Sequence, residues 1–254
     1  MTDKQIEFGF WYWDTQNNFP PKSIMSPSDY DGSSSVNIAC TQILEITPTE
    51  QKKLIKAWVN FLPNLKKIET LWFSSNTHQD LFDSVCEMDN LIGLNIKLSN
   101  IKSLDKITKL KKLKYLRIGS SSKLESIEHL CDLANLEVLS IENFKKISDF
   151  SSLTKLTNLK FLTIEGGFYT KQKIDSFEPL GKLQNLIYLS TSMISCPNKS
   201  SEQIYSLKNL ITLNWAFDLS KYEMDRLKIE LPKLKYLPNR YHDDNMKKIK
   251  EMIR

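Results

Sequence analysis

The chain has 254 residues, of which 41% are hydrophobic and 26% charged, and such a composition excludes a largely disordered chain. Lys and Arg number 35 and Asp and Glu number 30, and the resulting net charge of +5 is spread along the whole sequence. A nucleic-acid binder would need its cations clustered on one face, so the charge pattern argues against a nucleic-acid partner.

The N-terminal residues carry no basic leader followed by an apolar segment, and no stretch approaches the roughly 20 apolar residues of a membrane span. We therefore expect a cytoplasmic protein without a membrane partner. The four cysteines contain no CxxC pair, which predicts reduced thiols, no bound metal and no cofactor: they are Cys40, Cys86, Cys131 and Cys196.

Residues 5–13 alternate between two sets of side chains, a period of two that is typical of a β-strand. The first set is Ile6, Phe8, Phe10 and Tyr12, and the second is Glu7, Gly9, Trp11 and Trp13. Residues 36–46 predict a second strand. Residues 14–35, which are rich in Pro, Ser, Asp and Asn, predict a long and mobile loop between the two strands.

A helix is predicted to begin after Thr47 and to end near Leu62. Thr47 and Glu50 have the spacing of a capping box, and Pro48 occupies the first helical position. The predicted helix has one apolar face, which we expect to cover the first repeat and so to complete an N-terminal cap over residues 1–64; this face comprises Leu54, Trp58, Phe61 and Leu65.

Residues 65–240 repeat the frame L-x-x-L-x-(L/I) at intervals of 22 to 27 residues, after a weaker copy that begins at Ile68. A repeat of this length indicates a solenoid, because one unit alone cannot bury its apolar edge. The leading residues of the seven clearest copies are Leu91, Leu113, Leu136, Leu159, Leu186, Leu210 and Leu234.

Between these copies, apolar residues recur at every third position, as in Ile101, Leu104, Ile107, Leu110 and Leu113. A period of three fits 3-10 turns, in which residues three apart face the same way. Each unit is therefore predicted to contain a strand and a short convex return. The strands are expected to form a parallel concave sheet of about eight strands.

The repeats resemble those of the leucine-rich repeat family, specifically the short type of about 22 residues found in bacterial internalins and in regulatory subunits of protein phosphatase 1. The resemblance implies a right-handed α/β solenoid with a cap at each end. Two copies depart from the family pattern, since Ser121 and Phe144 stand at or near the place where the family usually has an asparagine after the strand.

The C-terminal end of the solenoid also requires a cap, because an open edge would expose the core. Ser220 and Glu223 have the spacing of a second capping box. Residues 241–254 are predicted to form a last capping helix, with Met246, Ile249 and Ile253 on its apolar face.

Alternation along each predicted strand places positions 3, 5 and 7 of the frame on the concave face. The tyrosines, phenylalanine, tryptophan and charged residues at these positions are the candidate partner-binding residues, because such residue types often dominate interface energy. They are Trp72, Tyr115, Arg117, Glu142, Phe161, Glu165, Tyr188 and Tyr236. The aromatic members are expected to form an exposed row. The alternative is that they only pair across strands and stiffen the sheet.

Two further aromatic residues are weaker candidates for partner contact. The unit of 27 residues contains an insertion, residues 166–171, which should project as a loop at the rim and carries Phe168 and Tyr169. Trp215 stands at an inward position and is expected in the core. A tolerated insertion with no role in binding explains the same loop equally well.

The sequence contains no P-loop, GxGxxG, HExxH or GxSxG motif, and its three histidines lie on different units. We therefore expect no enzymatic activity. The prediction is a bacterial protein-binding scaffold whose partner is another protein, for example a toxin or enzyme that it inhibits as an immunity protein. A regulatory or scaffolding subunit is the alternative. A ligase or a GTPase-activating protein is less favoured, because it would require a catalytic domain or a catalytic arginine.

Overall fold

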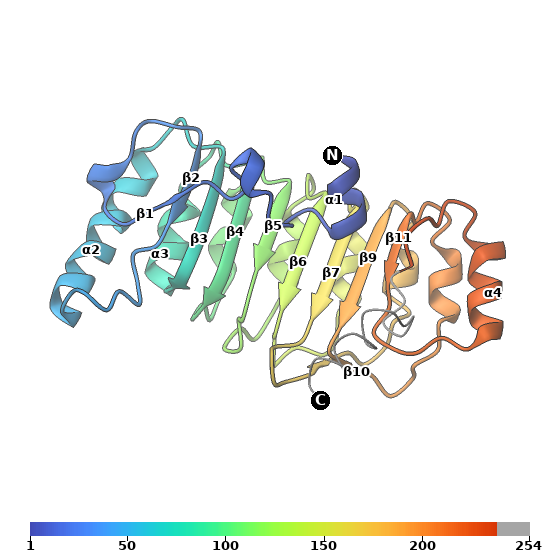
Figure 1. Ribbon diagram of the computed structural model, residues 1–254. Coiled ribbons are helices and arrows are strands. Elements are labelled where there is room, and N and C mark those ends of the chain that lie inside the picture. Colours follow the sequence, from blue (N-terminus) through green and yellow to red (C-terminus); the bar gives the residue numbers. More distant parts are fainter. Residues whose placement is uncertain (238–254) are drawn as a thin grey trace, which may run out of the picture.

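The structure, a computed structural model, describes residues 1–237 and contains one parallel sheet of nine strands (Figure 1). The predicted leucine-rich repeat solenoid is thereby confirmed. In spatial order the strands are β1 (Ser23–Ile24), β2 (Ser35–Ile38), β3 (Thr70–Thr77), β4 (Gly93–Ser99), β5 (Tyr115–Ile118), β6 (Val138–Glu142), β7 (Phe161–Glu165), β9 (Tyr188–Ser192) and β11 (Thr212–Asn214).

The strands pair in an unbroken register from β4 to β11, so equivalent residues of successive repeats lie side by side. The leucines at position 4 of the frame form one such row inside the solenoid. All of them are fully buried, and they join the repeats into one continuous core: Leu94, Leu116, Leu139, Leu162, Leu189 and Leu213.

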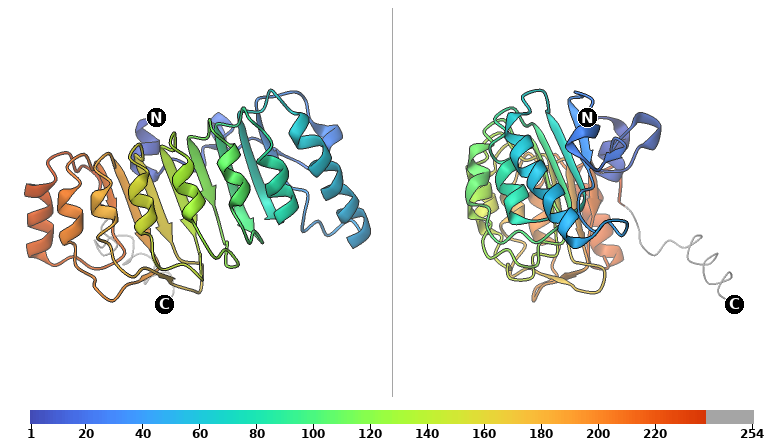
Figure 2. Two further views of the ribbon diagram at one scale, coloured as in Figure 1. Left: turned by 180° about the vertical axis from the view of Figure 1, so that it is seen from behind. Right: turned by 90° about the vertical axis from the view of Figure 1, so that its left-hand side faces the viewer.

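The opposite side of each repeat is formed by a short helical segment, and these segments face the viewer in the left view of Figure 2. The prediction of 3-10 turns from the period of three is confirmed in five repeats. These turns are Asp105–Lys109, Glu128–Asp132, Ser151–Lys155, Leu180–Lys182 and Glu202–Ser206. We call the other face of the sheet, which these turns do not cover, the concave face.

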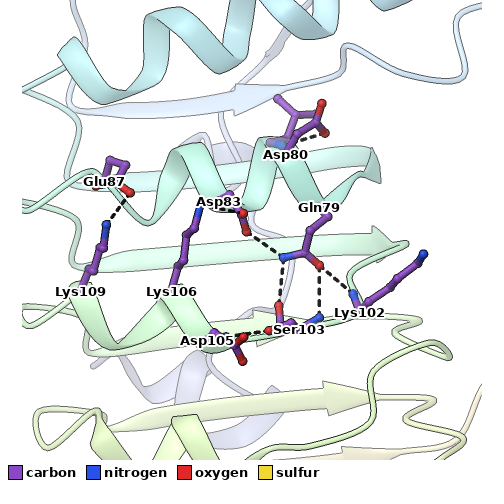
Figure 3. A network of polar contacts seen from close by, with 10 residues as sticks. Gln79, Asp80, Asp83, Glu87, Lys102, Ser103, Asp105, Lys106 and Lys109 are labelled. Carbon is purple, nitrogen blue, oxygen red and sulfur yellow. Dashed lines mark hydrogen bonds and ion pairs between the residues drawn. The ribbon is translucent and has the colours of Figure 1, made fainter.

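The return after β3 contains an α-helix, α3 (Gln79–Val85), which is tied to the following repeat by polar contacts (Figure 3). The side-chain amide of Gln79 donates to Asp83 at 2.7 Å and to the carbonyl of Ser103 at 3.1 Å. Its oxygen accepts the backbone N–H groups of Lys102 and Ser103. Lys106 adds an ion pair to Asp83 at 2.9 Å, and this contact raises the pKa of Lys106.

Asparagine side chains connect neighbouring repeats immediately before the frame. Each amide donates to a backbone carbonyl 22 to 28 residues earlier in the chain, so each bond crosses from one repeat to the previous one. The asparagines of this ladder are Asn90, Asn135, Asn158, Asn185 and Asn209.

The predicted capping helix is present as α2 (Pro48–Phe61). The Thr47 hydroxyl accepts the N–H of Glu50, and the Glu50 carboxylate accepts the N–H of Thr47, as the capping box predicts. Trp58 is fully buried against the first repeat. The predicted strand over residues 36–46 is shorter in the structure, since β2 ends at Ile38 and Gln42 adopts a positive φ of 59°.

The prediction of a strand over residues 5–13 is wrong, because the chain forms the helix α1 (Asp3–Phe8) followed by a turn. Thr2 and Gln5 form a capping box that starts this helix, and Gly9, with φ of 97°, ends it. The prediction of a mobile loop over residues 14–35 did not include the ordered structure found there. This stretch contains β1 (Ser23–Ile24) and the packed side chain of Phe19.

The second capping box begins α4 (Lys221–Glu230), where Ser220 accepts the N–H of Glu223. The predicted last helix, residues 241–254, lies outside the described residues. The division of the chain at residues 64 and 240 stays a prediction.

Candidate protein-binding face

The concave face carries a row of large side chains at position 3 of the frame. The register places Tyr115, Val138, Phe161, Tyr188 and Thr212 side by side on successive strands. Phe161 and Tyr188 stack with ring centroids 5.3 Å apart. Alternation thus puts these residues together on the concave face, as the sequence predicts.

The expectation that this aromatic row is exposed is wrong, because residues 1–22 of the same chain cross the concave face (Figure 1). We call these residues the N-terminal segment. Phe10 stacks on Tyr115 with centroids 4.4 Å apart, and Trp11 meets Trp72 edge to face at 6.0 Å. As a result Phe161 is only 1% exposed. The N-terminal segment lies on the opposite side of the sheet from the convex turns (Figure 2).

Polar contacts fix the ends of the N-terminal segment. The Thr212 hydroxyl donates to the carbonyl of Ile6 at 2.5 Å. Asp14 accepts hydrogen bonds from Asn17 and from the Tyr12 hydroxyl, both at 2.8 Å. Both hydrogen bonds lower the pKa of Asp14, and the bond from Asn17 has the larger effect. The bonds to Asp14 lie within the N-terminal segment, whereas the Asn37 side-chain amide donates to the carbonyl of Pro21 at 3.0 Å. The N-terminal segment is therefore held on the sheet by packing and by the hydrogen bonds from Thr212 and Asn37.

Within residues 1–237, no segment covers the half of the concave face that lies toward the C-terminal ends of the strands (Figure 1). We call this half the open strip. It is polar and carries both signs of charge. Arg117 forms an ion pair with Glu142 at 3.3 Å, and Ser120 donates to Glu142 at 3.1 Å. Lys97, on β4, and Arg117, on β5, line the same hollow. Glu165, on β7, pairs in register with Glu142, on β6.

Two segments that carry exposed aromatic side chains lie at opposite margins of the open strip, the N-terminal segment and the insertion after β7 (Figure 1). Phe8 and Trp13, from the N-terminal segment, are 61% and 65% exposed. Phe168 and Tyr169, in the insertion after β7, are 88% and 90% exposed. The insertion is fixed by β8 (Gln172–Lys173), which pairs with β10 (Ile194–Ser195), so its predicted position at the rim is confirmed.

The predicted partner-binding residues fall into three groups. Trp72, Tyr115, Phe161 and Tyr188 lie under the N-terminal segment. The charged residues face the open strip: Arg117, Glu142 and Glu165. Tyr236 forms a parallel bridge with Thr212 beyond the last strand and is half-buried.

Sequence reasoning missed Phe8 and Trp13 as surface residues. The aromatic run around Trp11 indicates that this stretch is unusual, but its alternation predicts a strand with its side chains in a sheet. The expectation for Trp215 is confirmed, since this side chain is 5% exposed in the core.

No three His, Cys, Asp or Glu residues within 1–237 are placed to hold a metal ion. The four cysteines are free thiols, and burial raises the pKa of Cys40 to about 12. A thiol with a raised pKa is a poor nucleophile.

Comparison with known families decides the classification. A family described as a leucine-rich repeat region matches residues 44–252. The chain belongs to the leucine-rich repeat family. Members of this family typically mediate protein–protein binding and are generally non-catalytic scaffolds. None of the curated proteins compared with this sequence matches it.

Several solved structures are similar to this chain, and the one with a TM-score above 0.5 has the same fold. Internalin C2 of Listeria monocytogenes shares 21% identity over 72% of this chain and 79% of its own, with a TM-score of 0.52. The internalin InlF of the same organism shares 18% identity over 80% of this chain and 65% of its own, with a TM-score of 0.49. A leucine-rich repeat protein of Leptospira interrogans shares 19% identity over 69% and 50%, with a TM-score of 0.46.

None of the helices within residues 1–237 has the length and apolar composition needed to cross a membrane.

Proposed function

We propose that this leucine-rich repeat protein binds a partner protein along the open strip, with the N-terminal segment in place. The supporting observation is the arrangement of exposed aromatic residues, Phe8 and Trp13 on one side and Phe168 and Tyr169 on the other, around a charged floor. Aromatic residues and arginine are the types that most often dominate binding energy, and scattered exposure of single residues would not produce two borders.

This proposal changes the role of the predicted contact residues. Arg117, Glu142 and Glu165 contact the partner directly. The covered aromatic residues contribute by holding the N-terminal segment on the sheet. The partner thus meets a surface built from two parts of the chain, the repeats and the N-terminal segment.

The test replaces Phe168 and Tyr169 together by alanine and measures affinity for a partner recovered by co-purification and identified by mass spectrometry. Loss of both side chains should weaken binding at least about tenfold, because each belongs to a class that contributes strongly at interfaces. The control is Leu44→Ala, since Leu44 is 95% exposed in the N-terminal cap, before α2, and belongs to neither proposed contact surface. Equal affinity of the double variant and the parent protein would contradict the proposal.

Within this function we propose an inhibitor that covers the working surface of a toxin or enzyme, as an immunity protein does, in a cytoplasmic setting. A binding face on a chain without a candidate metal site among residues 1–237 suits occlusion of a partner. The four free thiols suit a reducing compartment. The bound enzyme or toxin should lose activity in proportion to the complex formed, and a partner that stays fully active when bound would contradict inhibition.

A scaffolding subunit is the second candidate, and one observation favours it. Exposed apolar side chains also occur at the far end of the solenoid, where Tyr222 is 73% and Ile229 79% exposed on α4. A second contact surface would allow two partners to bind at once. Light scattering of the assembled complex distinguishes the two functions, since an inhibitor gives a binary complex and a scaffold gives a ternary one.

A further inference from the structure

A small cavity lies where the N-terminal segment meets strands β2 to β5. Its volume is about 70 Å³, which is enough space for a few water-sized groups. Trp13 and Pro20 form its outer wall, and strand residues form its floor. The floor residues are Asn37, Trp72, Phe73, Ser74, Asn95, Lys97 and Arg117.

The charged residues that line this cavity are both cations. Lys97 forms no ion pair with any residue in 1–237, and its ammonium lies 5.9 Å from the centre of the Trp13 ring. The carboxylates of the open strip lie farther along it, on β6 and β7, where Glu142 and Glu165 pair in register. The end of the open strip at β4 and β5 therefore carries positive charge, and the end at β7 carries negative charge.

Arg117 has unused hydrogen-bonding capacity at this cavity. Its guanidinium donates one hydrogen bond among the described residues, from Nη2 to Glu142 at 3.3 Å. Its Nε is buried and has no acceptor. A guanidinium has five N–H donors, so the Nη donors that Glu142 does not use remain for a further acceptor.

We propose that this cavity receives the carboxylate of an aspartate or glutamate side chain of the partner protein. The inference deepens the proposed function and rests on it. A carboxylate between Lys97 and Arg117 accepts charge-assisted hydrogen bonds from both cations, and such bonds are stronger than those between neutral groups. Trp13 shields the pair from solvent on one side, which strengthens the attraction.

The test selects binders from a library of random peptides displayed on phage, with the full-length protein as target. Peptides selected on the parent protein should be enriched in Asp and Glu relative to the unselected library. Their affinity should fall at least about tenfold on Lys97→Ala and should not change on Lys52→Ala, which removes an exposed lysine from α2. A fresh selection on Lys97→Glu should yield peptides that have exchanged acidic for basic residues.

The outcomes separate this inference from the proposed function. Peptides without acidic enrichment, no selected peptides at all, or acidic peptides that bind Lys97→Ala and Lys97→Glu as well as the parent protein would overturn the acidic subsite. If non-acidic peptides bind and lose affinity when Phe168 and Tyr169 are replaced, the open strip remains the binding face while the acidic subsite fails. Peptides insensitive to both sets of changes would contradict both proposals.

Discussion

The ring of Phe10 stacks on the ring of Tyr115, with centroids 4.4 Å apart and planes inclined by 29°. One residue belongs to the N-terminal segment and the other to β5, more than a hundred positions later in the chain. The sequence predicts that Tyr115 contacts a partner, but in the structure the chain's own N-terminal segment packs on it. The N-terminal segment is a wall of the concave face and defines which half of that face remains open.

Trp11 and Trp13 provide a matched pair of substitutions. Trp11 is 8% exposed and Trp13 is 65% exposed, although they are two positions apart. Trp11→Ala should lower the free energy of unfolding by about 3 kcal/mol, because it leaves a cavity against Trp72 and Phe19. Trp13→Ala should change it by less than about 0.5 kcal/mol. Urea denaturation followed by circular dichroism checks both values, and equal costs would contradict the buried position of Trp11.

Gly9 and Gly32 both have positive φ values, of 97° and 85°, so replacement by alanine strains the backbone at either position. A Cβ at Gly9 would also lie 3.0 Å from the hydroxyl oxygen of Tyr188, whereas a Cβ at Gly32 would meet nothing within 4 Å. Gly9→Ala should therefore loosen the N-terminal segment more than Gly32→Ala does. Hydrogen exchange of the Asp14 amide, which bonds to Phe19, measures the loosening, and identical exchange in both variants would contradict the contact with Tyr188.

Gln172 is 2% exposed and connects the insertion to the turn after β6. Its oxygen accepts the N–H of Phe144 at 2.7 Å, and its amide donates to the carbonyls of Ile147 and Lys173. Gln172→Leu should lower the free energy of unfolding by about 2 to 3 kcal/mol, because buried backbone groups lose their partners.

Gln184→Leu is the control for this substitution, since Gln184 is exposed and, within residues 1–237, its side chain bonds only to the carbonyl of Gly181. It should cost less than about 0.5 kcal/mol. Urea midpoints of the two variants provide the comparison, and a similar midpoint for both would show that Gln172 does not support the turn.

Asp14 makes the stability of the N-terminal segment depend on pH. Hydrogen bonds from Asn17 and Tyr12 hold the pKa of Asp14 below its usual value, so the folded state favours the charged carboxylate. This contribution is fully present above the unfolded pKa of about 3.9 and is lost as the pH falls through the lower folded pKa. The difference in urea midpoint between the parent protein and Asp14→Asn should thus be constant near neutral pH and shrink below about pH 4. A difference that grows on acidification would contradict this role.

The repeat frame predicts the fold well because each repeat contains the same spacing of apolar residues. Leu139 and Leu162 are buried neighbours on adjacent strands because alternation and a near-constant repeat length place them there. The capping box at Thr47 is equally local, since its partner Glu50 is three residues away. Local signals of this kind do not depend on the rest of the molecule.

The covered half of the concave face depends on contacts that no local pattern contains. Ile6 and Thr212 share a hydrogen bond although they are 206 residues apart in the chain. The aromatic residues around Trp11 alternate as in a strand, yet the capping box at Thr2 and the positive φ at Gly9 produce a helix and a turn. Phe144 stands where the family usually has an asparagine, and the hydrogen bonds of that turn come instead from Gln172, which is 28 residues later in the chain.

The most direct test of the central claim is hydrogen–deuterium exchange of the full-length protein, free and bound to a partner or a selected peptide. The account predicts that binding slows exchange at the C-terminal ends of β5 to β7 and in residues 166–171. It also predicts that exchange in residues 5–14 is slowed or unchanged, because the N-terminal segment stays on the sheet. Faster exchange in residues 5–14 on binding would show that the ligand displaces the N-terminal segment, and it would contradict the account.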